Sequence, residues 1–170
     1  MELLVKKKRT VKDIILVFVS VFLGITLVGV IGFFGMFLPY MGAIIALIIA
    51  AIIYGIYIFA TSINLEYEYI FTNGYVDIDK IINVRKRKRM ASFDIREIEM
   101  FSTIKNPEFE KYLNSKEVKK LYACRDKKEL DTHFVIFMMN SAKTMLLFNP
   151  NEKMINEFER INPQKVKLNV

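Results

Sequence analysis

The chain has 170 residues, of which 53% are apolar and 25% are charged, and its formal net charge is +7 at pH 7. No Asp, Glu, Lys, Arg or His occurs between Ile14 and Leu65, so the average composition describes neither half of the chain. An ordinary soluble fold is excluded for this apolar segment, because surface helices of soluble proteins keep a polar face.

The apolar segment is too long for a single membrane-spanning helix. A bilayer core of about 30 Å needs about 20 apolar residues in a helix. The segment is expected to turn back between Gly35 and Gly42, because Pro39 lacks a backbone donor and disfavours helix before it. A signal peptide would be shorter and would end at a small-residue cleavage site. We therefore predict a transmembrane α-helical hairpin at residues 14–61, with spans of about 14–35 and 41–61.

Basic residues flank this hairpin on both sides. Residues 6–9 and residues 85–89 are all basic, and the turn between the spans carries no charge. The positive-inside rule then places both chain ends in the cytoplasm. We predict a multi-pass cell-membrane protein with a basic cytoplasmic N-terminus (residues 1–13) and a cytoplasmic domain (residues 62–170).

The second half of the chain has the period-two apolar pattern of β-strands. Asn73-Gly74 and Asn140-Ser141 are typical of tight hairpin turns. Seven strands are predicted, at residues 66–71, 75–80, 83–93, 94–100, 120–124, 134–139 and 143–148. Residues 106–117 interrupt this pattern and predict a long loop with one helical turn.

The end of the chain changes to helical spacing. Asn149 is a candidate N-cap, with Pro150 at the first helical position and Glu152 three residues after the cap. Pro163 ends the predicted helix. Its apolar face consists of Met154, Ile155, Phe158 and Ile161.

Seven strands followed by one helix resemble the pleckstrin-homology-like barrel, over about residues 66–163. Several segments are also similar to a family of bacterial two-span membrane proteins that carry such a domain. They are Glu66-Tyr67-Glu68-Tyr69, Thr72-Asn73-Gly74, residues 77–83, residues 85–89 and residues 149–154. The resemblance implies a membrane α-helical hairpin plus a mainly-β domain, a seven-stranded barrel capped by a C-terminal helix. It implies no particular activity.

The sequence offers little for catalysis. His133 is the only histidine and Cys124 the only cysteine, and no motif joins them. The chain has no glycine-rich phosphate loop, nucleophile elbow or metal-ligand cluster in its sequence. We therefore expect a protein that is not an enzyme, with no catalytic residues, no metal and no cofactor.

The basic run is the most informative polar feature, and it has two interpretations. Its residues are Arg85, Lys86, Arg87, Lys88 and Arg89. Alternation places the three arginines on one strand face and the two lysines on the other, so the five cannot all bind one ligand. In one interpretation the run contacts anionic lipid head groups, with the arginine face contributing more. In the other it is a solvated strand whose charges pair with Asp77 and Asp79.

Nucleic acid is not an expected partner. Residues 62–170 carry 20 basic and 16 acidic side chains, and the basic run contains no aromatic residue on which a base could stack. We predict a membrane-anchored, non-enzymatic binding module whose domain docks on anionic inner-leaflet lipid. The alternative is a scaffold that recruits a cytoplasmic protein partner through residues 106–117 or an exposed strand edge.

Overall fold

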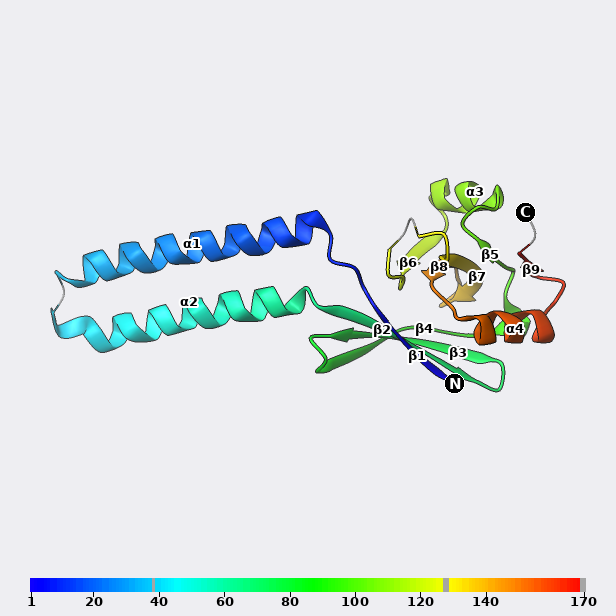
Figure 1. Ribbon diagram of the computed structural model, residues 1–170, viewed down its shortest axis with the longest axis horizontal. Helices are drawn as coiled ribbons and strands as arrows, with labels where there is room; N and C mark the ends of the chain where they lie inside the picture. The colour runs from blue at the N-terminus through cyan, green and yellow to red at the C-terminus, as the bar shows by residue number, and fades with distance from the viewer. Residues whose placement is uncertain (38, 127–128, 169–170) are drawn as a thin grey trace. The chain divides into compact units, whose positions relative to one another are not determined.

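The computed structural model describes residues 1–37, 39–126 and 129–168, which form nine strands, four α-helices and two short 3-10 helices (Figure 1). They divide into two compact units. The first, which we call the helical hairpin, is Arg9–Asn64. The second, the β domain, combines Met1–Lys8 with Leu65–Val170.

The helical hairpin consists of α1 (Val11–Gly35) and α2 (Gly42–Ser62), joined through the 3-10 helix η1 (Pro39–Met41). A capping box starts α1: the Thr10 hydroxyl accepts from the Asp13 N–H, and the Asp13 carboxylate accepts from the Thr10 N–H. Both helices are long and apolar enough to cross a membrane, as the two predicted spans require. Leu38, in the predicted turn, lies outside the described residues.

Two glycines bring the helices close together. A Cβ atom at Gly24 would lie 2.1 Å from Ile56 Cδ1, and one at Gly35 would lie 2.9 Å from Ile45 Cδ1. Only the absence of a side chain permits these contacts, as is common between membrane helices. The α1–α2 interface therefore depends on Gly24 and Gly35.

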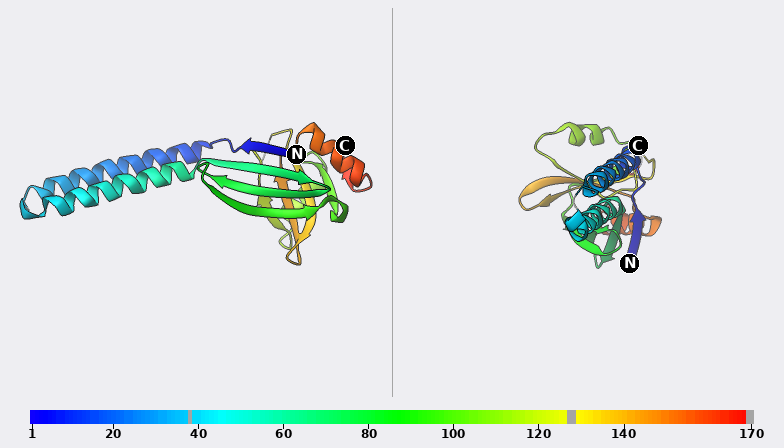
Figure 2. Two further views of the ribbon diagram at one scale, coloured as in Figure 1. Left: turned by 90° about the horizontal axis from the view of Figure 1, so that it is seen from below. Right: turned by 90° about the vertical axis from the view of Figure 1, so that its left-hand side faces the viewer.

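The first sheet of the β domain has the order β1-β2-β3-β4, with all neighbours antiparallel. Its strands are β1 (Glu2–Lys6), β2 (Leu65–Thr72), β3 (Tyr75–Ile82) and β4 (Lys86–Asp94). Figure 2 shows β2, β3 and β4 as a long curved meander. The Asn73-Gly74 turn between β2 and β3 has the positive φ angles of the predicted hairpin.

Strand β1 was not anticipated from the sequence. Its Val5 lies opposite Tyr67 of β2 and is buried, with 4% of its surface exposed. The domain boundary predicted at residue 62 therefore omits one strand, and the N-terminal segment 1–13 is not separate from the domain. The helical hairpin is an insertion between two adjacent strands of one sheet.

The second sheet has the order β6-β8-β7-β5-β9. Its strands are β5 (Met100–Thr103), β6 (Lys119–Tyr122), β7 (His133–Met139), β8 (Ala142–Phe148) and β9 (Val166–Lys167). The strands predicted near β6, β7 and β8 are confirmed, and so is the Asn140-Ser141 turn, where both φ angles are positive. Strand β9, which pairs in parallel with β5, was not predicted.

The strand predicted at residues 94–100 is wrong. Asp94 instead caps the 3-10 helix η2 (Ile95–Glu97), and its carboxylate accepts a hydrogen bond of 2.8 Å from the Arg96 N–H. Ile95 and Ile98 are both buried although they are three residues apart, a spacing that a regular strand would place on opposite faces. Because η2 separates β4 from β5, the two strands fall into different sheets.

Helix α4 (Glu152–Ile161) confirms the predicted amphipathic helix but starts at a different residue. Asn151, not Asn149, is its N-cap, and the Asn151 side chain accepts from the Met154 N–H at 3.0 Å. Asn149 is buried, and its Oδ1 accepts from the Arg125 N–H at 2.7 Å. Because the Asn149 side chain is buried and bonded to the segment that follows β6, it cannot cap α4.

One core joins both sheets and α4. Met154 and Phe158 of α4 are fully buried in it, against Tyr69 from the first sheet and Phe101 from the second. The described strands nevertheless form two open sheets, with no ladder between them. The predicted single seven-stranded barrel is therefore not confirmed, although a sheet-rich domain with a C-terminal helix is.

Candidate functional site

The basic run lies at the start of β4 and in the turn before it. Arg85 belongs to the turn, Lys86 to Arg89 belong to the strand, and all five side chains are exposed. β4 pairs with β3 over its whole length, so the acidic residues of β2 and β3 lie within reach. The structure thus separates the five cations by the strand face on which each lies.

Two of the arginines form ion pairs within the sheet. Arg87 Nη1 lies 3.0 Å from Glu68 Oε2 of β2, and Arg89 Nη1 lies 2.7 Å from Asp77 Oδ1 of β3. Arg89 also bonds through Nε to the buried Asp79 carboxylate. This hydrogen bond raises the pKa of Arg89 further above its ordinary value. Arg89 thus pairs with Asp77 and Asp79, the acids named in the second interpretation of the basic run, whereas the pairing of Arg87 with Glu68 was not predicted.

A β-bulge aims the arginines at those acids. Ile78 of β3 lies opposite Ala91, and the next residue, Asp79, lies opposite Arg89, so Met90 has no partner. Without this extra residue Arg89 would share a face with the buried Ala91, because strand side chains alternate. The bulge therefore turns the arginines outward while the following residues stay in the core.

The lysines of the run lie on the other face, with a third lysine beside them. Lys80 of β3 is the direct cross-strand partner of Lys88, and Lys86 lies two residues before Lys88 on the same face. Across residues 1–37, 39–126 and 129–168, no ion pair or hydrogen bond involves any of these three ammonium groups. Like charges directly opposite each other destabilise a sheet. We call Lys80, Lys86 and Lys88 the lysine cluster.

Lys80 was missed by sequence reasoning. It lies on a strand whose acidic residues, Asp77 and Asp79, are on the opposite face. Its position became evident only from the register, which depends on the three-residue connection after Ile82. A hairpin drawn across residues 83–85 of the sequence would have paired Lys80 with Lys88.

The lysine cluster lies at the end of the first sheet at which the chain enters β2. α2 ends at Ser62 and β2 starts at Leu65. Leu65 pairs with Ile82, and Ile82 pairs with Lys86. With strands about 4.8 Å apart, Lys86 lies about 10 Å across the sheet from Leu65. The lysine cluster therefore lies near the end of β2 at which the chain enters the β domain.

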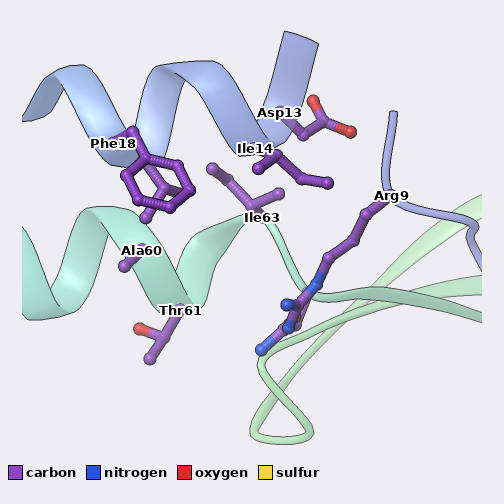
Figure 3. Close-up of a pocket in the computed structure, with 9 residues that line it drawn as sticks. Arg9, Asp13, Ile14, Phe18, Ala60, Thr61 and Ile63 are labelled. Atoms are coloured by element: carbon purple, nitrogen blue, oxygen red, sulfur yellow. The ribbon is translucent and has the colours of Figure 1, made fainter. Parts of the chain in front are cut away.

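A cavity of about 390 Å³ lies between the ends of α1 and α2 (Figure 3). Ile14 and Phe18 of α1 face Ile63 there, and most of the wall is apolar. Arg9 is engaged at the cavity, because its Nη2 donates to Asn64 Oδ1 at 2.5 Å. The cavity offers an apolar groove but no described cation without a partner, so it is the weaker candidate for an anionic ligand.

No chemistry-bearing cluster stands out elsewhere in the described part of the chain. No group of three metal-ligating side chains occurs among the residues that the structure describes. His133 is buried, its ring stacks on Phe101, and burial lowers its pKa, which favours the neutral ring. Cys124 is buried as well. Both residues are part of the packed interior.

A family model described as a bacterial PH-like domain (DUF6106) matches residues 1–168. The match includes β1, the helical hairpin and both sheets, which is nearly the whole chain. The chain belongs to the bacterial PH-like domain family. No curated protein and no solved structure matches it.

The bacterial PH-like domain assignment agrees with two apolar helices joined to a sheet-rich domain with a C-terminal helix. It confirms the resemblance recognised in the sequence. Pleckstrin-homology-like domains are generally binding modules rather than enzymes, so the family assignment favours a binding role.

Proposed function

We propose that this bacterial PH-like protein is a membrane-anchored, non-enzymatic binding module whose β domain docks on anionic lipid of the inner leaflet. The observation that carries the proposal is the lysine cluster, three exposed or half-exposed ammonium groups without an acidic partner in the described chain. An anionic surface would relieve the repulsion between Lys80 and Lys88. Arg85, which also lacks an ion pair there, extends the cationic surface into the turn.

Because the helical hairpin would tether the β domain to the membrane, weak contacts between the domain and the lipid are sufficient. Each basic residue near an anionic leaflet contributes about 1 kcal/mol. Only Ile63 and Asn64 separate α2 from β2, so docking is intramolecular and takes place at a high effective concentration. A cluster of three or four lysines and arginines is enough under these conditions to hold the domain on the leaflet for most of the time.

Protein recruitment is the less favoured alternative. Residues 106–117, the candidate recruiting loop, contain the short helix α3 (Glu108–Asn114). Its apolar residues Phe109, Tyr112 and Leu113 pack against the second sheet, and the Phe109 ring lies 5.5 Å from that of Phe134. These side chains stabilise the domain and are therefore not available as a separate binding surface.

Co-sedimentation with vesicles tests lipid docking. The β domain is made by joining Lys8 to Leu65 with a short linker, since the Lys7 N–H already donates to the Leu65 carbonyl at 3.0 Å. We expect part of it to pellet at millimolar concentrations of phosphatidylcholine and phosphatidylserine vesicles, because about 3–4 kcal/mol of binding corresponds to a Kd of roughly 1–6 mM. Replacing Lys80, Lys86 and Lys88 by Gln weakens binding by about 3 kcal/mol, or roughly 150-fold.

A matched control replaces three exposed lysines elsewhere in the domain, Lys111, Lys116 and Lys119, by Gln. It changes the net charge equally, so its binding should remain close to that of the parent domain. Binding of the parent should also fall steeply between 0.1 M and 1 M salt, as the Debye length shrinks from about 10 Å to about 3 Å. Equal binding of all three proteins to anionic and neutral vesicles would contradict the proposal.

Topology is tested by labelling introduced cysteines in intact cells. The pairing of β1 with β2 requires the N-terminus and the β domain to lie on one side of the membrane, and the basic flanks favour the cytoplasmic side. We expect a cysteine replacing Tyr40, which is fully exposed, to react with an impermeant thiol reagent added outside. A cysteine replacing Ser115 should react only after lysis. The opposite pattern would reverse the orientation.

A further inference from the structure

The turn between β3 and β4 has an unusual residue at its tip. Asn83 and Val84 adopt positive φ angles of 51° and 58°. The corresponding positions of the other two hairpin turns are Asn73-Gly74 and Asn140-Ser141. Asn and Gly tolerate this left-handed conformation, whereas a β-branched residue in it is a genuine outlier. Local conformation therefore argues against valine at position 84.

Packing within the chain does not account for the valine either. Its side chain is 76% exposed, so it contributes little to the core of the β domain. A strained backbone position with an exposed apolar side chain gains nothing for folding that glycine or asparagine would not provide. Such an outlier leads to a functional hypothesis, because strain that the fold does not need is kept where a site needs it.

The neighbours of Val84 indicate what it contacts. Arg85 and Lys86 follow it directly, and neither forms an ion pair with any described residue. The turn closes the end of the sheet at which Ile82 pairs with Leu65, the residue that directly follows the helical hairpin. An apolar tip with unpaired cations beside it is complementary to a leaflet, where anionic head groups lie above an apolar interior.

We propose that Val84 is an apolar anchor that inserts into the leaflet on which the lysine cluster docks. The inference rests on the proposed docking function and adds the depth and the contact point of the docked domain. The side chain of Val84 enters the boundary between head groups and acyl chains. Arg85 and Lys86 remain at the level of the phosphates.

Fluorescence quenching tests the insertion directly in the full-length chain. Val84 is replaced by Cys and labelled with bimane, while the native Cys124 is buried and stays unlabelled. The control carries the same label at Ser141, an exposed residue with positive φ in another hairpin turn. In anionic vesicles with brominated acyl chains we expect strong quenching at position 84 and little at 141. Equal quenching at the two positions would overturn the proposal.

Trypsin cleavage of unlabelled full-length protein separates this inference from the docking function. Lys86 to Arg89 are cleavage sites that docking covers, so cleavage should be slower in nanodiscs with phosphatidylserine than with phosphatidylcholine alone. Val84→Gly relieves the backbone conformation but removes the anchor, and it should reduce this protection about tenfold, as expected for one valine leaving an apolar environment. Val84→Ile should protect as the parent does.

The outcomes distinguish the two proposals. If the parent shows protection and Val84→Gly retains all of it, docking stands and the anchor is wrong. If the parent is cleaved at the same rate in both lipids, docking itself fails. Stabilisation of the turn by glycine together with loss of lipid protection would confirm that valine serves the membrane rather than the fold.

Discussion

Replacing Phe158 by Ala should destabilise the β domain by about 3–5 kcal/mol, the usual range for removing a buried aromatic ring. Phe158 is fully buried, and its ring stacks on Phe101 with centroids 4.3 Å apart. It also lies 6.1 Å from the Phe148 ring and 6.4 Å from the Phe93 ring, so it joins both sheets to α4. A domain that is stable by about 5–15 kcal/mol would lose a large part of its stability.

Amide hydrogen exchange of the full-length protein measures this loss. The slowest amides of β7 and β8 exchange through global unfolding and report its free energy. Glu159→Ala is the matched control, since it alters the exposed neighbour on the same helix and should change stability by no more than about 0.5 kcal/mol. Similar exchange rates in both variants would show that α4 does not hold the two sheets together.

Replacing Val5 by Asp should release β1 from the first sheet. Val5 is buried opposite Tyr67, so the change removes an apolar contact and places a carboxylate in an apolar environment. The combined cost is about 3–5 kcal/mol. We expect β2 amides that donate to β1 to exchange much faster, with a smaller effect on β7.

The neighbouring residue provides the control for β1. Leu4 lies opposite Glu68 on the other face of the strand and is 51% exposed, so Leu4→Asp should leave exchange in β2 nearly unchanged. If both substitutions accelerate exchange equally, the inward orientation of Val5 is wrong. If neither does, Glu2–Lys6 is not a strand of this sheet in solution.

The features that were predicted correctly depend on residues close together in the sequence. Asn73-Gly74 and Asn140-Ser141 determine their turns locally. Met154 and Phe158 reveal the buried face of α4 by their spacing alone. The long apolar segment likewise predicts two helices without any tertiary information.

The features that were missed depend on non-local pairing. β1 is five residues long, and its partner β2 lies beyond two helices, so nothing near Val5 in the sequence indicates a strand partner. β9 is shorter still and pairs with β5 across α3, β6, β7, β8 and α4. Short strands that rely on distant partners have too few residues for a periodic pattern.

The division of the basic run was only half predictable. Alternation separated Arg87 and Arg89 from Lys86 and Lys88, which the structure confirms. The bulge at Met90 decides which of these faces meets the acids, and no residue pattern marks it. From the sequence we expected the arginine face to contribute more to docking. Because two of these arginines are paired within the sheet, we propose instead that the lysine cluster contributes more.

The insertion of the helical hairpin between β1 and β2 also orders the events of biosynthesis. β1 leaves the ribosome first but has no partner until β2 follows both helices, because synthesis runs from the N-terminus. The first sheet can therefore be completed only after both helices have been synthesised. Under the proposed membrane topology, a copy with one helix misplaced would keep β1 and β2 on opposite sides of the membrane and leave an open strand edge. Cellular proteases degrade copies that expose such unfolded features.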